Sequence, residues 1–181
     1  SHPGITFTVL RTALAVGPHM KNFFHQLYSM PVLALAHGHT PLQHFLHEDD
    51  LGAALHVALR QDVPGTYNVG ADDTVPADWA FREAGVRLVR LPSPVLKALM
   101  NAAFALHVLP ASQGWASLSE HTIFPNSEKF KSATGWKPSY SSAQTFRDYL
   151  RARERQPDTF KQSMLWWVFR SGRRTRPTMA V

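Results

Sequence analysis

The 181-residue sequence contains no cysteine. A disulfide framework, a thiolate metal site and a cysteine nucleophile are therefore excluded, and the redox compartment is left open. No apolar run approaches the roughly 20 residues that a helix needs to cross a bilayer, and residues 1–4 lack the pattern of a secretory signal. We therefore expect a cytoplasmic protein.

Two motifs that carry chemistry are also absent. The sequence has no Gly-x-Ser-x-Gly, the turn that exposes a nucleophilic serine, so hydrolase chemistry has no support. It also has no Gly-x-Gly-x-x-Gly, whose glycines let the backbone approach a pyrophosphate. The sequence thus offers no phosphate-binding turn to a dinucleotide.

The formal charge of +6 is concentrated at one end of the chain. Of 19 basic residues, four lie in the last dozen positions (Arg170, Arg173, Arg174 and Arg176), which leaves 15 against 13 acidic residues elsewhere. The body is therefore nearly neutral, and we expect no specific nucleic-acid partner. The tail, residues 156–181, is interpreted as a solvated terminus that attracts anions without specificity.

The sequence is 44% hydrophobic and 11% aromatic, which is enough for a packed core. Strand and helix patterns alternate in the first half and helices dominate the second, which favours an α/β fold over a bundle or a sandwich. We expect strands at 5–10, 32–36, 43–46, 66–69 and 86–91. We expect helices at 19–30, 51–60, 76–84, 94–106, 127–134 and 142–155.

Two of these elements lead to further expectations. Residues 5–10 are apolar and β-branched and predict a buried strand, so we expect a preceding piece of the fold to be missing. Asp49 and Asp50 are expected to form the N-cap and first turn of the helix at 51–60.

Three stretches, in this order, resemble one family. Residues 10–18 resemble the Leu-Arg-Pro-x-x-x-Tyr-Gly-Pro segment of extended short-chain dehydrogenases/reductases, the NAD-dependent epimerase/dehydratase proteins. Residues 45–51 resemble their Phe-Val-His-Val-x-Asp-Leu, with the Gly-Thr-Tyr-Asn-Val-Gly of 65–70 in the expected place, and residues 134–138 resemble their Leu-Gly-Trp-x-Pro. The resemblance covers roughly residues 5–150.

This resemblance implies a Rossmann domain with a small mixed α/β substrate domain. Residues 1–155 would be its C-terminal Rossmann elements and substrate lobe, with the N-terminal nucleotide-binding half missing. The family transfers hydride to and from NAD or NADP with a Tyr-x-x-x-Lys pair as acid and base. None of the four tyrosines has lysine four positions later. We therefore expect no catalytic residue, no turnover and no tight cofactor binding in this chain alone.

The resemblance also implies site residues. Thr12 and Ala13 match the turn beside the nicotinamide and are the candidate cofactor contacts. Leu14 and Val16 are candidate substrate contacts, although Leu14 stands where sugar-nucleotide enzymes often place asparagine and Val16 replaces the usual tyrosine. A leucine cannot hydrogen-bond a sugar hydroxyl.

Three more residues are candidate substrate contacts. Gln43 stands where nucleotide-sugar enzymes carry a phosphate-binding arginine, and glutamine has neither its charge nor its fork geometry. His19 and His44 lie where the chain is expected to border the cleft. The expected substrate is a small molecule, and a nucleotide sugar is disfavoured.

Other polar residues are expected to be structural. His47 and Asp50 resemble the family's His-x-x-Asp, but a packed histidine and a helix cap explain them better. His37 and His39 flank a glycine in a loop, and without thiolates we predict no metal site.

Two hypotheses remain open: a substrate-side portion of an NAD(P)-dependent epimerase, dehydratase or reductase, or a non-catalytic ligand-binding or interaction module derived from that family. A homodimer remains open too. So does contact of the aromatic and basic tail with a membrane surface.

Overall fold

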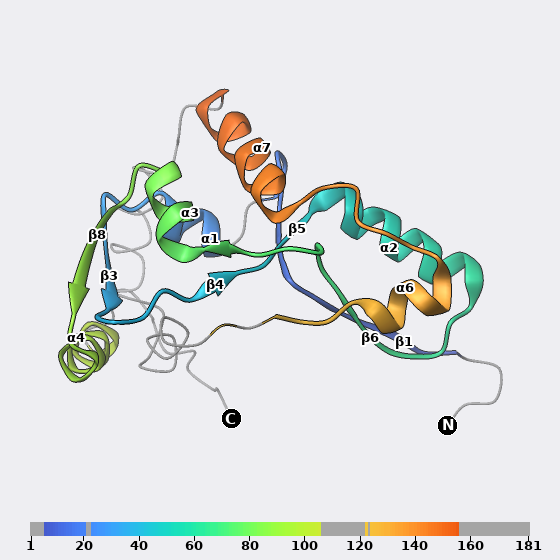
Figure 1. Cartoon of the computed structure of the whole chain (residues 1–181), viewed down its shortest axis with the longest axis horizontal. Coiled ribbons are helices and arrows are strands. Elements are labelled where there is room, and N and C mark those ends of the chain that lie inside the picture. Colours follow the sequence, from blue (N-terminus) through green and yellow to red (C-terminus); the bar gives the residue numbers. More distant parts are fainter. Residues whose placement is uncertain (1–5, 21–22, 106–121, 123, 156–181) are drawn as a thin grey trace, which may run out of the picture.

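The computed structural model describes residues 6–20, 23–105, 122 and 124–155. Eight strands and six helices are described in chain order (Figure 1): β1 (Thr8–Thr12), β2 (Leu14–Val16), α1 (Phe23–Tyr28), β3 (Val32–Ala36), β4 (Leu42–Gln43), β5 (Phe45–His47), α2 (Glu48–Gln61), β6 (Gly65–Val69), β7 (Val75–Pro76), α3 (Ala77–Glu83), β8 (Arg87–Leu91), α4 (Ser93–Ala105), α6 (Glu128–Thr134) and α7 (Ser142–Arg155). The predicted tail at 156–181 lies outside these residues.

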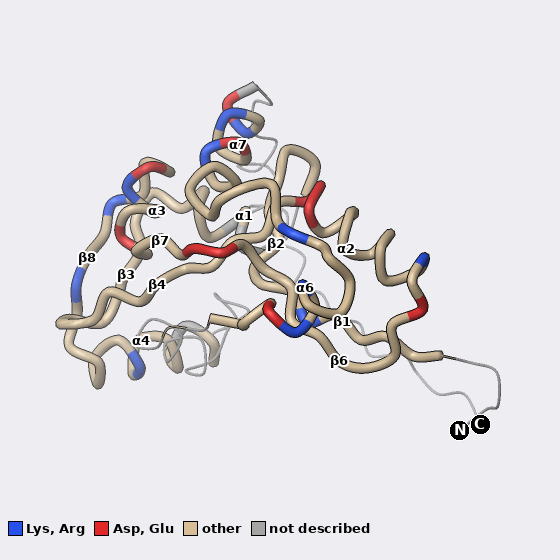
Figure 2. Tube along the Cα trace, turned by 45° about the vertical axis from the view of Figure 1, so that its right-hand side comes forward, with Lys and Arg blue, Asp and Glu red and all other residues tan. Residues whose placement is uncertain are grey.

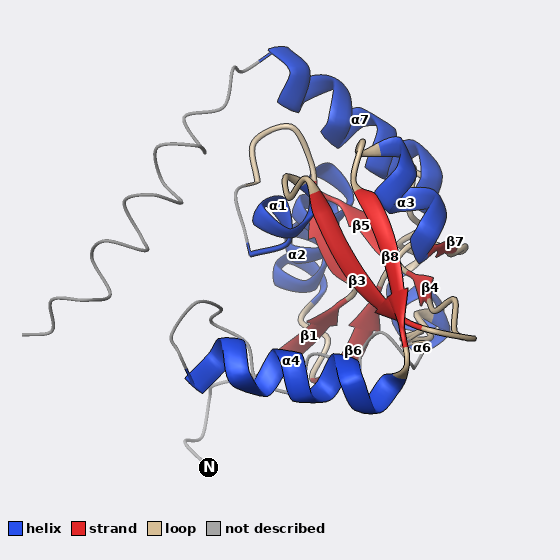
Figure 3. Cartoon of the chain, turned by 90° about the vertical axis from the view of Figure 1, so that its left-hand side faces the viewer, coloured by secondary structure: helices blue, strands red, loops and turns tan. Residues whose placement is uncertain are grey.

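The strands pair mostly in parallel. β1 pairs with β6, β2 with β5 and β3 with β8, all parallel, whereas the short β4 and β7 are antiparallel. Helix α2 leads from β5 to β6 and is thus part of the crossover connection between the parallel strands β1 and β6. Figure 3 shows β3 and β8 side by side with α4 below them. The predicted α/β fold class is confirmed.

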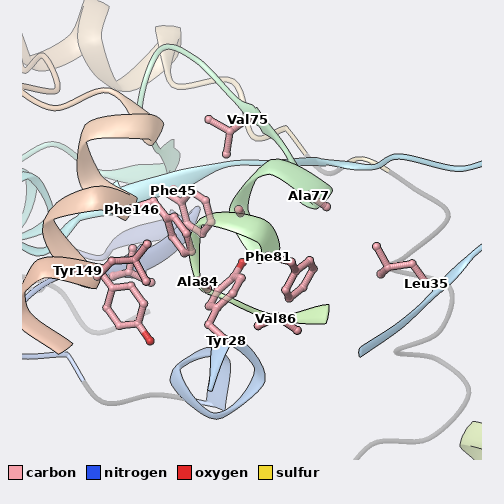
Figure 4. Close-up of a cluster of buried hydrophobic side chains, with 13 residues drawn as sticks. Tyr28, Leu35, Phe45, Val75, Ala77, Phe81, Ala84, Val86, Phe146 and Tyr149 are labelled. Carbon is pink, nitrogen blue, oxygen red and sulfur yellow. The ribbon is translucent and has the colours of Figure 1, made fainter. Parts of the chain in front are cut away.

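The larger core is aromatic and centres on β5. Phe45 is fully buried, and its ring stacks on Phe146 of α7 at 4.9 Å between centroids. Tyr28 of α1 packs edge-on against Phe146 at 4.8 Å, and Phe81 of α3 completes the cluster (Figure 4). Elements far apart in sequence are thus held together by rings that bury large apolar areas.

A second core lies under α2. Leu46 of β5, Ala54 of α2 and Val69 of β6 are fully buried there, against Phe130 of α6 and Trp136. Helix α6 ends at Gly135, which adopts φ 73°, a left-handed conformation that glycine adopts without strain. This core fixes β6 and β5 relative to each other.

Most predicted elements are confirmed with small shifts of their bounds, among them β3, β6, α3, β8, α4, α6 and α7. The predicted strand at 43–46 is two strands, β4 and β5, with His44 between them. Strand β2 was missed because three residues give too short a pattern. Helix α1 is described over Phe23–Tyr28, within the predicted 19–30, and His19 lies outside it, with its backbone N–H donating to the carboxylate of Glu48.

One prediction was wrong, and another was right only in part. The first strand was expected to be buried, but Phe7 and Val9 are 69% and 49% exposed because, among the described residues, β1 pairs only with β6. Helix α2 begins at Glu48, and its N-cap is His47, whose side chain accepts a hydrogen bond from the backbone N–H of Asp49. Asp49 and Asp50 lie in the first turn.

Charged side chains are unevenly distributed along the described chain. Figure 2 shows them along α2, α3, α6 and α7, whereas α4 has a single charge, Lys97. Even so, no helix within the described ranges is both long and apolar enough to cross a membrane.

Candidate functional site

The chain changes partner strands at Ala13. Thr12 is the last residue of β1 in register with β6, opposite Val69, and the Ala13 N–H donates to the Val69 carbonyl at 2.8 Å. The Leu14 N–H then donates to the His44 carbonyl at 3.1 Å, and β2 continues beside β5. Ligands of open α/β sheets bind beyond the carboxyl ends of parallel strands, where neighbours diverge. This point is therefore the candidate site.

The structure brings several predicted site residues to this point. Thr12 is exposed, Ala13 is buried and Leu14 is half-buried. His44 lies beside them, because its ring and the Cβ of Ala13 both approach the same glycine, Gly70. Val16 lies farther along β2, with its side chain in the aromatic core. That these residues contact a ligand stays a prediction.

His44 is the buried polar group of the site. Its side chain is 5% exposed, and Nε2 lies 2.6 Å from the carbonyl oxygen of Ala71. The ring stacks on Phe124 with centroids 4.7 Å apart, and no described residue forms a hydrogen bond with Nδ1. Burial lowers the pKa of His44, while the Ala71 carbonyl and the charges of Asp73 and Asp72 oppose that shift. The ring is therefore neutral at pH 7.

Gly70 makes room for this histidine. A Cβ built on Gly70 would lie 2.7 Å from Nε2 of His44 and 3.1 Å from the Cβ of Ala13. Both distances are shorter than normal van der Waals contacts, so any larger residue would displace the ring. Packing against His44 thus explains why the motif at 65–70 ends in glycine.

Gln43 is engaged by a buried tyrosine. The hydroxyl of Tyr28 donates to the side-chain oxygen of Gln43, and Tyr28 itself is fully buried. Burial strongly raises the pKa of the Tyr28 hydroxyl, with a further contribution from Tyr149, so it remains a donor at any physiological pH. Gln43 is thereby fixed in orientation at the edge of the aromatic core.

His19 lies in the loop after β2 and is bonded to Glu48, the first residue of α2. Its backbone N–H donates to Glu48 Oε1 at 3.1 Å, and its ring Nδ1 lies 2.7 Å from the same oxygen. The side chain is 86% exposed. Gly17 leaves space for the Glu48 carboxylate, since a Cβ there would lie 2.8 Å from Oε2. No contact of the described residues joins His19 to His44.

His47 and Asp50 have structural contacts, as predicted. Nε2 of His47 lies 3.2 Å from Asp148 of α7, and its ring stacks on Tyr140 at 3.8 Å. Asp50 accepts the backbone N–H groups of Ser139 and Tyr140 at 2.9 and 3.1 Å. Together they attach α2 to the segment that leads into α7.

Sequence patterns missed three neighbours of the site. Phe124 stacks on the His44 ring, although no motif or predicted element includes Phe124. Ser127 donates to the Gly70 carbonyl at 3.4 Å, and Asp73 accepts the Ser142 N–H at 2.6 Å. Ser142 was expected to begin a helix, but nothing in its spacing indicated a bond to residue 73.

The loop histidines are exposed. His37 and His39 lie in the turn after β3, where the Arg90 guanidinium donates to the His39 carbonyl at 2.5 Å. Within the described ranges, no three histidine or acidic side chains are close enough to hold a metal ion.

Comparison with known proteins gives distant matches. No family model matches the chain. Uncharacterized proteins of Mycobacterium bovis and Mycobacterium tuberculosis are 27% identical over 155 residues, which cover 86% of this chain and 41% of theirs. The chain therefore spans about two fifths of the length of these curated relatives.

Solved structures match over a similar share of this chain, at lower identity. A dTDP-glucose 4,6-dehydratase of Bacillus anthracis in complex with NAD aligns with a TM-score of 0.57, at 16% identity, over 86% of this chain and 47% of its own. A UDP-N-acetylglucosamine 4-epimerase of Bacillus cereus aligns with a TM-score of 0.55, at 18% identity, over 86% and 48%. The enzyme WbmG of Bordetella bronchiseptica, in complex with NAD, aligns with a TM-score of 0.56, at 16% identity, over 84% and 44%. The described residues therefore share the Rossmann-type α/β fold of epimerase, dehydratase and related short-chain dehydrogenase enzymes.

Proposed function

We propose that this chain forms the substrate-side part of an NAD(P)-dependent epimerase, dehydratase or reductase. The observation that carries the proposal is the change of partner strands at Ala13, which leaves the carboxyl ends of β1 and β6 beside the buried ring of His44. Parallel α/β sheets bind ligands at such a point. The solved structures of the same fold include complexes with NAD, which supports a nicotinamide cofactor.

In this proposal the residues divide into two groups. Exposed Thr12 and the backbone of Ala13 border the nicotinamide. The substrate contacts are Leu14, Val16, His19, Gln43 and His44, of which Gln43 and His44 are already fixed by Tyr28 and Ala71. Val16 is 2% exposed, so it would act by shaping the wall behind Leu14.

The chain alone is proposed to be inactive. It has no glycine fingerprint for the pyrophosphate and no tyrosine-lysine pair to move a proton. A tyrosine with a pKa near 10 needs a nearby cation to act as a base at neutral pH. The complete enzyme would be cytoplasmic, with a small-molecule substrate, and dimerisation or membrane contact through the tail remain further proposals.

A second candidate is a non-catalytic binding module that kept the substrate lobe. The exposed Phe7 and Val9 on β1 argue against it, because a stand-alone module is expected to cover such residues. Translation of the complete natural gene distinguishes the two. A glycine fingerprint and a Tyr-x-x-x-Lys upstream support the enzyme, and an open reading frame without them supports the module.

The proposal is tested at Thr12 in the protein encoded by the complete gene. T12W places a large ring at the exposed carboxyl end of β1 and is expected to weaken NAD(P) binding at least about tenfold, measured by calorimetry. T66W is the matched control, since Thr66 is also exposed but lies near the amino end of β6, opposite Val9. Equal affinity of T12W and wild type would contradict the proposed cofactor position.

A further inference from the structure

We infer that the ligand of this site presents an uncharged hydrogen-bond donor, a hydroxyl or an amide N–H, to Nδ1 of His44. The inference rests on the proposed function, because it assigns the chemistry of the substrate at the same strand ends.

The first step is the position of the proton on the ring. Nε2 lies 2.6 Å from the Ala71 carbonyl oxygen. A carbonyl only accepts, so Nε2 must carry the hydrogen of this bond. In a neutral imidazole the other nitrogen is then a bare acceptor. Nδ1 of His44 therefore offers a lone pair.

The second step is that the ring cannot flip, which would swap the positions of Nδ1 and Nε2, without losing its contacts with Ala71 and Gly70. The edge formed by Cε1 and Nε2 lies so close to Gly70 that a Cβ there would approach Nε2 to 2.7 Å. Phe124 stacks on one ring face at 4.7 Å. The orientation of the lone pair is thus set by the protein before any ligand binds.

The third step is that this lone pair is unsatisfied. Nδ1 is buried and has no hydrogen-bond partner among the described residues, whereas buried polar atoms in folded proteins nearly always have one. Leaving such an acceptor without a donor costs about 1–3 kcal/mol. A ligand hydroxyl or amide N–H that reaches Nδ1 in the plane of the ring would satisfy it.

The fourth step excludes an anionic group at this position. A phosphate or carboxylate would meet a lone pair instead of a proton, and the negative charges of Asp72 and Asp73 lie close enough to affect the ring. The side-chain oxygen of neighbouring Gln43 already accepts from Tyr28, and Leu14 adds no charge. The site as built therefore favours a neutral, hydroxyl-bearing or amide-bearing molecule.

The tautomer is tested first, without ligand. In the chain labelled with ¹⁵N at histidine, NMR at pH 7.5 should show His44 neutral, with hydrogen on Nε2 and a bare Nδ1; H44Q assigns the signal by removing it. A proton on Nδ1 would overturn the inference without touching the proposed cofactor position, which T12W tests independently.

Ligand chemistry is tested next with defined probes. Glucose, galactose and myo-inositol serve as neutral polyols, and glucuronate and inorganic phosphate as anions. At least one polyol is expected to shift the Nδ1 signal, and neither anion should do so. A shift with an anion, or none with any polyol, would overturn the inference.

Two variants separate the acceptor from the structural contact. H44Q keeps an N–H that can reach the Ala71 carbonyl but has no acceptor at the Nδ1 position, so it should fold normally and bind the active polyol about tenfold more weakly. H44N can place an oxygen near the Nδ1 position but loses the Ala71 contact, so it should be less stable and retain binding better than H44Q. H37Q, at an exposed loop histidine, is the control. Unchanged polyol affinity in H44Q would overturn the inference.

Discussion

Strands β5 and β1 occupy very different environments. All three residues of β5 are buried, between the aromatic core on one side and the core under α2 on the other. Strand β1 has Val9, Arg11 and Thr12 exposed, and among the described residues its only partner is β6. The comparison teaches that the chain packs tightly around β5, between two cores, and leaves much of β1 exposed.

The largest expected effect is a difference in unfolding free energy between substitutions on β5 and on β1. F45A removes a fully buried ring from the centre of the aromatic core and is expected to cost about 3–5 kcal/mol of unfolding free energy. V9A on β1 should cost about 0.5 kcal/mol or less, because Val9 is half exposed. Urea unfolding of both variants measures the difference. Equal losses would mean that β1 is packed as tightly as β5.

A smaller effect is expected at the junction that holds α2 against the segment before α7. Asp50 is buried and accepts two backbone N–H groups, so D50A should lose about 2–3 kcal/mol. D49A is the matched control, since the side chain of Asp49 is 70% exposed and should contribute far less to the free energy of unfolding. Thermal unfolding of the pair checks this, and a D49A loss as large as that of D50A would contradict the assignment.

The smallest expected effect is a pH dependence at the site. Burial lowers the pKa of His44 in the folded chain below its ordinary 6.5, so between the two values the unfolded chain binds more protons. Stability should therefore fall as the pH drops below about 6.5 and be fully present above it. H44Q should show a weaker fall between pH 7 and 5. Identical slopes for H44Q and wild type would show that His44 is not the cause.

Much of the fold could be predicted from the sequence, and the features that could not be predicted have physical reasons. Helices α4, α6 and α7 follow from local periodicity and from Gly135, because helix formation depends on neighbours in sequence. The exposure of Val9 could not be predicted, since an apolar β-branched residue gives the same pattern whether its strand has one neighbour or two.

The site shows the same limit. Thr12, Ala13 and His44 come from adjacent motifs, and their proximity follows from parallel pairing of the strands that carry them. Phe124 on the His44 ring and the Tyr28 hydroxyl on Gln43 join residues with no pattern between them. Such contacts depend on how the layers pack, which local sequence does not encode.

The central claim is that this chain supplies substrate contacts and strand ends but not the cofactor-binding turn. Calorimetric titration of NAD⁺ and NADP⁺ into the 181-residue chain and into the protein of the complete gene tests it most directly. We predict no measurable binding to the chain alone and clear binding of one cofactor to the complete protein. Tight binding to the chain alone, or NAD(P)-dependent turnover by it, would contradict the account.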